Sequence, residues 1–456
     1  MESSQGVLTS LDDAPLKRVH WEWTFLAAMG DYLDAGSIVA GGSSLAVWAS
    51  FYHLNLGLIG LIGAFSSNGI STAIGALVGG RLGDIYGRKF IYGLDLLLYA
   101  IGTLPIIFAF NAPMVIIGYM IMGFAVGADV PTSWSLIAEF APRKSRGRLM
   151  GLTNIFWYVG PIVILLLSLA FAPLGILGTR LVFVSLLIVA LVTYVLRRRL
   201  TESPRWLYLT GKTAAVGEAM QSIGEATTAS AVAPVVLQKS KLKDLFTRQN
   251  MKKFLFIVPI YAFWGIPAGT YGFFLPYIFK TMGAESSGAA DGLEILWFAS
   301  AIVTVLFVFM PLNDRIDRRL LYGISAAFCA AAFFLVVFFP ITNPVVAITN
   351  VLLFGLGQGI GLWPLQRIWS VELFPTMLRN TAQGVLWSFM RLVLGLWSLY
   401  LPIFTVQAGF NVVAIILGAM FTYNLIIGVI FGPRTQGQSL EQIQQPPLEV
   451  SGETAV

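Results

Sequence analysis

The chain has 456 residues, of which 57% are hydrophobic and only 11% are charged. Because a soluble domain carries about 25% charged residues, this composition excludes a soluble protein and indicates a polytopic membrane protein. The single cysteine, Cys329, excludes a disulfide framework within the chain, and the two distant histidines argue against a histidine metal cluster.

The formal net charge is +6, but the positions of the basic residues argue against nucleic-acid binding. Of the 29 Lys and Arg residues, only Arg180 and Lys280 are expected on the outer side, with Arg367 and Arg391 inside helices. By the positive-inside rule, the side that holds the others is cytoplasmic, together with both termini. We therefore expect a multi-pass protein of the plasma (inner) membrane.

Twelve apolar runs are long enough to cross a bilayer, since a membrane helix needs about 20 apolar residues. Their centres lie near residues 34, 68, 100, 123, 160, 188, 266, 302, 330, 358, 393 and 421. A polar segment separates the sixth run from the seventh, so the fold class is predicted to be all-α, with two six-helix bundles. The expected organisation is a cytoplasmic N-terminus (1–21), an N-terminal bundle (22–197), a cytoplasmic linker (198–253), a C-terminal bundle (254–432) and a cytoplasmic tail (433–456).

Two motifs recur about half the chain later, which indicates that the two halves arose by duplication. Residues 139–146 (EFAPRKSR) return as residues 372–379 (ELFPTMLR), and residues 80–89 (GRLGDIYGRK) are echoed by residues 310–319 (MPLNDRIDRR). Each motif lies between long apolar runs. The repeated unit is therefore a set of membrane helices with charged loops on one side.

These loops resemble those of the major facilitator superfamily. Residues 80–89 are similar to its G-x-x-x-D-x-x-G-R-K/R loop between helices 2 and 3. Residues 201–207 (TESPRWL) resemble the P-E-S-P-R-W-L signature of the sugar porter branch, and residues 433–441 (PRTQGQSLE) its P-E-T-K-G-x-S-L-E ending. The resemblance implies the major facilitator fold of 12 transmembrane helices, and a secondary transporter that works by alternating access with its site at the midplane.

Charged residues of these loops are predicted to form a cytoplasmic gate that closes and reopens in each cycle. Ion pairs at a partly wet interface contribute about 0 to 1 kcal/mol each, so they break readily. Asp317 and Arg434 stand where the family has glycine and glutamate, which weakens the resemblance in the second half. The alternative interpretation is that the charges are topology determinants and solvated loop residues. The predicted gate residues are Asp84, Arg88, Glu139, Arg146, Arg205, Asp314, Arg318, Glu372 and Arg379.

Acidic residues inside apolar runs are candidates for proton coupling, because a charge at the bilayer centre costs about 2.5 to 3.5 kcal/mol. Asp31 and Asp34 lie three residues apart in helix 1 and share a face. The resemblance gives Asp34 the role of the aspartate that takes up the coupling proton, with Asp129 in helix 4 as the second candidate. The alternative is an aspartate that an arginine holds permanently ionised.

The predicted site departs from the sugar porter pattern in two places. Tyr119 stands where proton-coupled sugar porters carry the helix 4 arginine that pairs with the helix 1 aspartate. Either Asp34 pairs with another base, or the coupling differs, or the protein is a uniporter. In helix 7, Phe263, Trp264 and Gly269 stand where the resemblance places amides that bind sugar hydroxyls.

Arg367 in helix 10 and Arg391 in helix 11 lie at the depth of the expected site. A planar guanidinium suits carboxylate, sulfonate or phosphate, so we expect a sugar acid or another small organic anion. Snorkelling to the lipid headgroups is the alternative for both arginines. The other predicted substrate-binding residues, for which helix packing is the alternative, are Asn154, Trp157, Tyr271, Gln358, Gln366 and Trp387.

The sequence therefore predicts proton-coupled uptake of a small polar organic solute. A neutral-sugar symporter, a facilitative uniporter and a drug exporter remain alternatives. A membrane enzyme is not expected, because no paired nucleophile and base is visible; no catalytic residues, metal or cofactor are predicted. The expected partners are the small-molecule substrate, a proton and the lipid bilayer, without nucleic acid, and the chain is expected to be monomeric.

Overall fold

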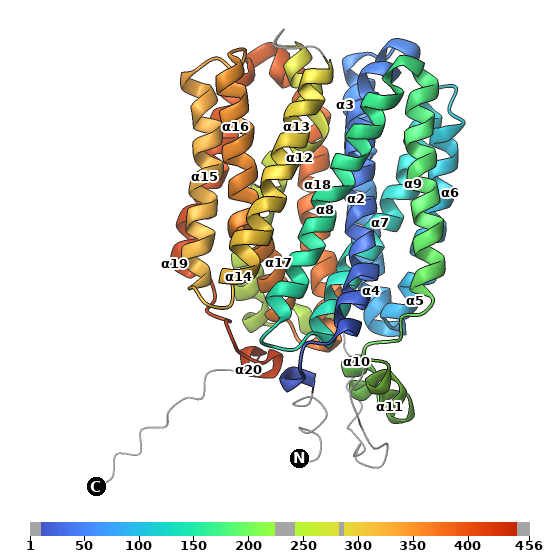
Figure 1. Ribbon diagram of the computed structural model, residues 1–456, viewed down its shortest axis with the longest axis vertical. Helices are drawn as coiled ribbons and strands as arrows, with labels where there is room; N and C mark the ends of the chain where they lie inside the picture. The colour runs from blue at the N-terminus through green and yellow to red at the C-terminus, as the bar shows by residue number, and fades with distance from the viewer. Residues whose placement is uncertain (1–10, 224–241, 282–286, 445–456) are drawn as a thin grey trace.

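The computed structural model describes residues 11–223, 242–281 and 287–444, and this part of the chain contains helices and no strand. The long helices stand side by side along one direction (Figure 1). The α-helices, long and short, are α2 (Arg18–Phe51), α3 (Leu56–Phe65), α4 (Ile70–Tyr86), α5 (Arg88–Tyr92), α6 (Asp95–Ile107), α7 (Ala112–Phe140), α8 (Arg146–Phe171), α9 (Ile176–Arg197), α10 (Pro204–Leu209), α11 (Thr213–Ser222), α12 (Arg248–Thr281), α13 (Ser287–Thr304), α14 (Met310–Leu312), α15 (Arg318–Phe338), α16 (Pro344–Gly357), α17 (Trp363–Glu372), α18 (Thr376–Ala408), α19 (Phe410–Phe431) and α20 (Leu440–Gln444).

Eleven described helical segments are long and apolar enough to cross a membrane. The first long helix, α2, is not among them although it has 34 residues and packs against α7, α8, α9 and α12. Its glycines and serines, together with Asp31 and Asp34, lower its hydropathy, and these polar residues are covered by protein rather than lipid. With α2 included, the helices match the twelve spans predicted from the apolar runs.

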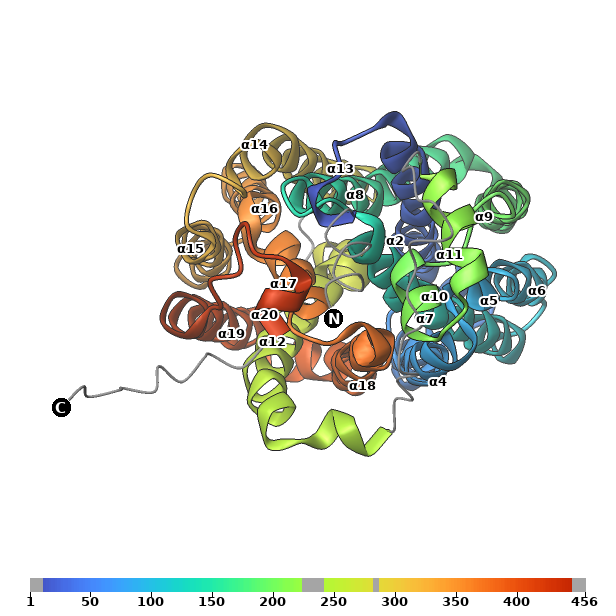
Figure 2. The ribbon, with the colours of Figure 1, turned by 90° about the horizontal axis from the view of Figure 1, so that it is seen from below.

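Helices α2 to α9 form an N bundle and α12 to α19 form a C bundle (Figure 2). The bundles meet where α18 runs along α3 and α4, where α12 packs against α2, and where α13 packs against α8. Three of the spans are interrupted: residues 66–69 separate α3 from α4, and π-helical turns at Val305–Phe309 and Gln358–Leu362 precede α14 and α17. Interruptions of this kind often lie at functional sites.

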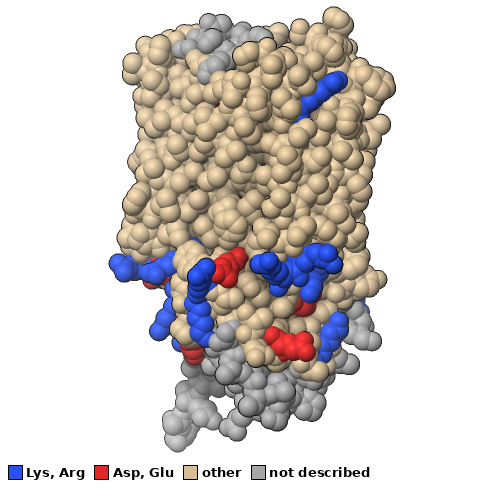
Figure 3. Space-filling view, turned by 45° about the vertical axis from the view of Figure 1, so that its right-hand side comes forward, with Lys and Arg blue, Asp and Glu red and all other residues tan. Residues whose placement is uncertain are grey.

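Charged side chains gather at one end of the molecule, which we call the charged end (Figure 3). The short helix α20, close to the last described residue, lies at this end, and so does α10 in the segment between the bundles (Figure 1). The opposite end carries few charges. Arg180 lies near that end, where it donates a hydrogen bond to the carbonyl oxygen of Ala109 at 2.7 Å.

The two bundles touch at both ends. At the opposite end, Gly42 of α2 lies against the backbone of Phe273 in α12, and Gly60 of α3 lies against the backbone of Leu399 in α18. At the charged end, the bundles are joined by the ion pairs described below. The structure is therefore an occluded arrangement, in which the space between the bundles is closed on both sides.

We expect Gly42→Leu to hold the bundles apart at the opposite end. A Cβ atom at this position would lie 2.7 Å from the carbonyl oxygen of Phe273, and this backbone atom cannot swing aside. Overpacking costs about 1 to 3 kcal/mol, which disfavours the occluded state by about tenfold or more. A cysteine in place of Ser44, which lines a cavity at that end, should therefore be labelled by a thiol reagent about tenfold more when Gly42→Leu is added. The native cysteine, Cys329, is buried and so adds no labelling of its own. Gly292→Leu is the control, because a Cβ atom at this position would meet nothing within 4 Å. Equal labelling in both variants would contradict the expectation.

Candidate transport site

Asp34 of α2 and Arg391 of α18 form an ion pair across the interface between the bundles. Arg391 Nη2 lies 2.7 Å from Asp34 Oδ2, and the two side chains are 2% and 0% exposed. Arg391 also donates from Nη1 to Asn68 Oδ1 at 2.7 Å, and Trp157 donates to Asp34 at 3.3 Å. The guanidinium lies 4.4 Å from the ring centroid of Trp387. Residues of both bundles thus converge on one buried charge pair.

Asn68 is placed at the interface by the interruption of the second span. Its backbone N–H donates to the hydroxyl of Ser66 in the break between α3 and α4, which holds the backbone of the break in place. Asn68 Nδ2 then donates to the carbonyl oxygen of Gly269 in α12 at 3.2 Å. The side chain therefore contacts two helices of the C bundle. Sequence reasoning missed it because an asparagine in an apolar run carries no charge to mark it.

A second ion pair, Asp31 with Arg367, crosses the interface next to the first. Arg367 Nη1 lies 2.8 Å from Asp31 Oδ1, and both side chains are fully buried. Trp134 donates from Nε1 to Asp31 at 3.1 Å, and Arg367 donates to the hydroxyl of Thr153 at 2.8 Å. The guanidinium lies 4.3 and 4.5 Å from the ring centroids of Trp134 and Trp363. Each aspartate of α2 thus meets one arginine of the C bundle.

This geometry does not support the expectation of an anionic substrate. Both arginines from which it was inferred face carboxylates, so the two pairs together present no excess positive charge. Snorkelling is also wrong for both, because the side chains are buried at the interface. The partner of Asp34 is another base, supplied by α18. Tyr119, at the place of the family arginine, donates instead to the carbonyl oxygen of Ser37 at 3.2 Å.

A cavity of about 20 Å³ lies beside Arg391 and is lined by residues of both bundles. This volume holds about one water molecule, so the occluded site has no room for a polar solute. Trp264 helps to close it: its ring stacks on Trp363 at a centroid distance of 3.6 Å, and its Nε1 donates to Gln358 at 2.6 Å. A bound solute requires these aromatic side chains and the two bundles to separate.

Three of the predicted substrate-binding residues lie near the charge pairs. Trp157 and Trp387 contact Asp34 and Arg391, as described above. Asn154 lies one turn before Trp157 in α8 and is fully buried. Asn154 Oδ1 and Trp387 Nε1 have no hydrogen-bond partner in the described part of the chain. These free polar atoms fit a site that makes its remaining hydrogen bonds to a solute or water.

Three others are occupied within the C bundle. The Tyr271 hydroxyl donates to Asn350 at 3.0 Å, and Gln366 Nε2 donates to the Tyr322 hydroxyl at 2.8 Å. Gln358 accepts from Trp264, as noted above. For these side chains the contacts favour the helix-packing alternative. Their role in substrate binding remains a prediction that requires rearrangement inside the bundle.

Asp129 lies inside the N bundle rather than at the interface. Its Oδ1 is 2.9 Å from Arg197 Nη1 and accepts from the Ser133 hydroxyl at 2.7 Å; Asp95 lies 3.3 Å from the same arginine. Gly30 of α2 makes room for the cluster, since a Cβ atom there would collide with the Asp129 carboxylate. These contacts favour the alternative of an aspartate held ionised by an arginine.

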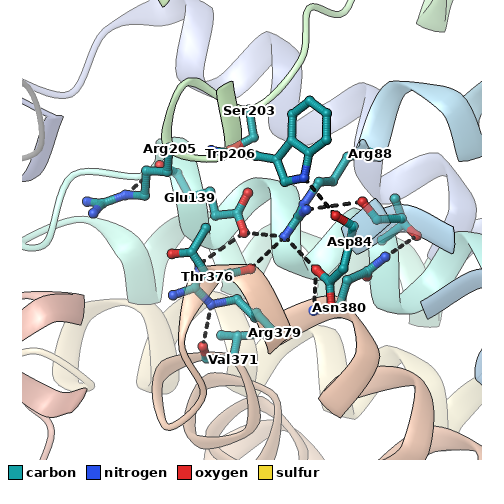
Figure 4. A network of polar contacts seen from close by, with 12 residues as sticks. Asp84, Arg88, Glu139, Ser203, Arg205, Trp206, Val371, Thr376, Arg379 and Asn380 are labelled. Carbon is teal, nitrogen blue, oxygen red and sulfur yellow. Dashed lines mark hydrogen bonds and ion pairs between the residues drawn. The ribbon is translucent and has the colours of Figure 1, made fainter. Parts of the chain in front are cut away.

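The first half of the predicted gate is a buried network that reaches into the C bundle (Figure 4). Glu139 of α7 accepts from Arg88 at 2.8 Å and from Arg379 of α18 at 3.0 Å. Asp84 lies 3.1 Å from Arg88 and accepts from both the backbone N–H and the hydroxyl of Thr381 in α18, each at 2.7 Å. The network therefore ties α4 and α7 to α18.

The second half of the gate is centred on Glu372 of α17. Glu372 lies 2.9 Å from Arg318 in its own bundle and 3.3 Å from Arg146 of α8. Arg146 and Arg205 share Asp12, at 3.3 and 2.9 Å. Sequence reasoning missed Asp12, which lies in the polar segment before the first span.

Asp314 is the most loosely held predicted member of the gate. Its carboxylate lies 3.8 Å from Arg318 and is 24% exposed. Burial raises the pKa of Asp314, and the charge of Arg318 only partly opposes the rise. The two departures from the family motif face each other: Arg434 Nε lies 3.7 Å from Asp317 Oδ2, and Asp317 caps α15 by accepting from the backbone N–H of Arg319.

The expectation of a partly wet gate is wrong for its first half. The side chains of Asp84, Arg88, Glu139 and Arg379 are all 0% exposed. The alternative of solvated loop charges is wrong for the same reason. Removing one partner of a buried ion pair costs about 3 to 5 kcal/mol, well above the value for an exposed pair. In the role predicted for it, this network opens readily only if water reaches these groups together.

Two six-helix bundles, closed at both ends around buried polar pairs that cross their interface, define a secondary transporter of the major facilitator fold. Residues 58–446 match the model of the family described as "Sugar (and other) transporter". The chain belongs to this family, which confirms the resemblance inferred from its motifs.

Relatives with curated names support the same class. The chain is 39% identical over 422 residues to the "Minor myo-inositol transporter IolF" of Bacillus subtilis, which covers 92% of this chain and 93% of that protein. It is 25% identical over 438 residues to the "Arabinose-proton symporter" of the same organism, again covering 92% and 93%. The solved structure of the proton:xylose symporter XylE bound to 6-bromo-6-deoxy-D-glucose has a TM-score of 0.79, with 21% identity over 93% of this chain and 98% of that one. The chain is thus a multi-pass membrane transporter and not an enzyme.

Proposed function

We propose that the protein takes up a neutral polyol or sugar together with a proton. The relative at 39% identity is by name a myo-inositol transporter, and it spans nearly the whole chain. The site is suited to hydroxyl groups: Asn68, Asn154 and Trp387 supply polar atoms among aromatic rings. An anion would have to compete with Asp31 and Asp34 for the two arginines. A neutral solute is therefore preferred over a sugar acid.

The observation that carries the proton coupling is the Asp34–Arg391 pair, because it joins the two bundles beside the cavity. A proton on Asp34 removes its charge and releases the guanidinium from α2. Arg391, whose Nε has no hydrogen-bond partner in the described chain, is then free to donate to hydroxyls of the solute, and Asn68 Oδ1, which accepts from Arg391 in the occluded state, is free to accept from them. When Asp34 loses the proton, it recaptures Arg391 and displaces the solute. Carboxylate and solute thus compete for the same guanidinium.

The direction of transport follows from the charges. By the positive-inside rule, the charged end faces the cytoplasm, which places α20 and α10 there and makes the opposite end the outer side. We place the protein in the plasma membrane. One proton moving inward with a neutral solute gains about 2.3 kcal/mol per 100 mV, roughly a fifty-fold gradient of solute.

Uptake into proteoliposomes tests this proposal. We expect an imposed inward proton gradient to drive accumulation of myo-inositol or a neutral sugar by about tenfold or more above equilibration, and a protonophore to abolish it. The panel pairs myo-inositol, xylose and arabinose with sugar acids and small organic acids. Uptake confined to the acids would contradict the neutral substrate. Uptake that ignores the gradient would contradict proton coupling and indicate a uniporter.

A further inference from the structure

The C bundle holds two carboxylates that the site described above does not use. Asp291 and Glu294 lie three residues apart in α13, so they share one face of the helix. Glu294 is 1% exposed, and its Oε1 has no hydrogen-bond partner in the described part of the chain. Asp291 is 9% exposed. Sequence reasoning passed over both because they lie near the start of the apolar run.

No described cation neutralises these carboxylates. Helix α13 packs against α8, α12, α16 and the π-helical turns Val305–Phe309 and Gln358–Leu362. Neither α16 nor the two turns hold a charged residue. Tyr158 and Tyr271 are the described titratable side chains of α8 and α12 in the half of the membrane away from the charged end, and Tyr271 is bound to Asn350. Arg180 donates to the backbone carbonyl of Ala109, just after the end of α6. The side chain of Lys280 lies outside the described residues. The described basic residues of α8 and α12, all at the charged end, are Arg146, Arg148, Arg248, Lys252 and Lys253.

Asp291 faces a cavity of about 230 Å³ at the outer end of the bundle interface. The other bundle supplies hydroxyl groups to its wall, from Ser43 and Ser44 of α2, Ser168 of α8 and Thr179 of α9. A cavity of this size, with hydroxyl groups and a carboxylate in its wall, holds several waters. Asp291 closes it from the side of the C bundle, so it opens further when the bundles separate at that end.

The same face of α13 leads toward the central site. Phe298 lies one turn beyond Glu294, and its ring centroid is 6.3 Å from that of Trp157. Trp157 in turn donates to Asp34. Glu294 therefore lies one helical turn from Asp291 in the outer cavity and one turn from Phe298, which contacts Trp157 in the wall of the central cavity.

We propose that Glu294 and Asp291 form a second proton-binding site, which is loaded from the outer side through this cavity and raises the ratio of protons to solute to two. A buried carboxylate without a counter-ion is stable only in its neutral form, so Glu294 carries a proton in the occluded state. The proton comes from outer water through Asp291, forming an O–H bond on Glu294. It leaves toward water in the central cavity once the bundles open at the cytoplasmic end.

Infrared difference spectroscopy of the purified protein in lipid vesicles tests proton binding without any solute. We expect a protonated carboxyl band at neutral pH in the wild type that Glu294→Gln lacks, while Glu22→Gln, an exposed side chain paired with Arg18, retains it. Identical carboxyl bands in the wild type and Glu294→Gln would overturn the proposal. Asp291→Asn, at the cavity wall, is a second variant; it should slow the exchange of that proton.

The proton-to-solute ratio tests transport, and this arm rests on the proposed function. With myo-inositol as the probe, the potential at which net flux stops should give a ratio of two in the wild type and one in Glu294→Gln. Accumulation at 100 mV should then fall about fifty-fold. A ratio of one in both would overturn the second site and leave the proposed function intact. Flux without any proton dependence would instead overturn the proposed function. The infrared result alone would then decide whether Glu294 binds a proton.

Discussion

Asp34→Asn is expected to remove the part of the proton-driven accumulation that the Asp34 proton supplies, while exchange of labelled for unlabelled solute continues. An asparagine cannot ionise, so it cannot alternately hold and release Arg391, which lies 2.7 Å away in the wild type. For one proton at 100 mV, the loss corresponds to about a fifty-fold lower accumulation. Uptake under an imposed gradient measures the loss, and counterflow in the same vesicles measures the exchange.

Variants of the partner separate coupling from folding. Arg391→Ala leaves the Asp34 carboxylate buried without a counter-charge, which costs about 3 to 5 kcal/mol. The double variant Asp34→Asn with Arg391→Gln removes both charges. Relative to Arg391→Ala it should recover thermal stability and exchange, but not the accumulation that the Asp34 proton drives. Full accumulation by Asp34→Asn would make Asp34 structural and move the proton to another carboxylate, with Asp31 and Glu294 the first to examine.

The sequence was sufficient for the fold because duplication and hydropathy act along the chain. Apolar runs predict spans, and the repeated loops predict which spans correspond. The charged residues of the predicted gate followed from the same repeats, and Glu139 and Glu372 each meet arginines in the structure. Their role as a gate stays a prediction. The repeats do not predict how far a charged residue is buried. From the sequence alone, an ion pair in a loop is expected to be exposed to solvent, whereas in the structure the Glu139 side chain is completely buried.

Pairing across the bundles was beyond the sequence. Asp34 and Arg391 are 357 residues apart, and no local pattern joins them. Taken separately, Arg391 suggested an anionic substrate, and Asp34 had no basic partner. In the structure the two residues form one ion pair. Asn68 and Glu294 were missed for different reasons. Asn68 is uncharged and depends on a helix break for its position, and Glu294 is marked only by the absence of a partner.

Glu139→Gln is expected to shift the protein toward the state that is open at the charged end. Glu139 is the acceptor for two buried arginines, Arg88 and Arg379, and Arg205 donates to its backbone carbonyl. Without the carboxylate charge, both guanidinium groups are buried with too little negative charge around them. Opening at the charged end lets water hydrate them, which lowers the free energy of the open state relative to the closed state. At about 3 kcal/mol, the open population rises on the order of a hundredfold.

A cysteine in place of Asn380 reports this opening, because Asn380 is buried and contacts Thr132 of α7 across the interface. Its labelling by an impermeant thiol reagent in inside-out vesicles should rise by about two orders of magnitude when Glu139→Gln is added. The control is Asp13→Asn, since Asp13 pairs with Arg143 on the surface, where the exposed fractions are 50% and 31% and the expected effect is at most about 1 kcal/mol. Equal labelling in the two variants would show that helix packing, rather than charge, holds the predicted gate closed.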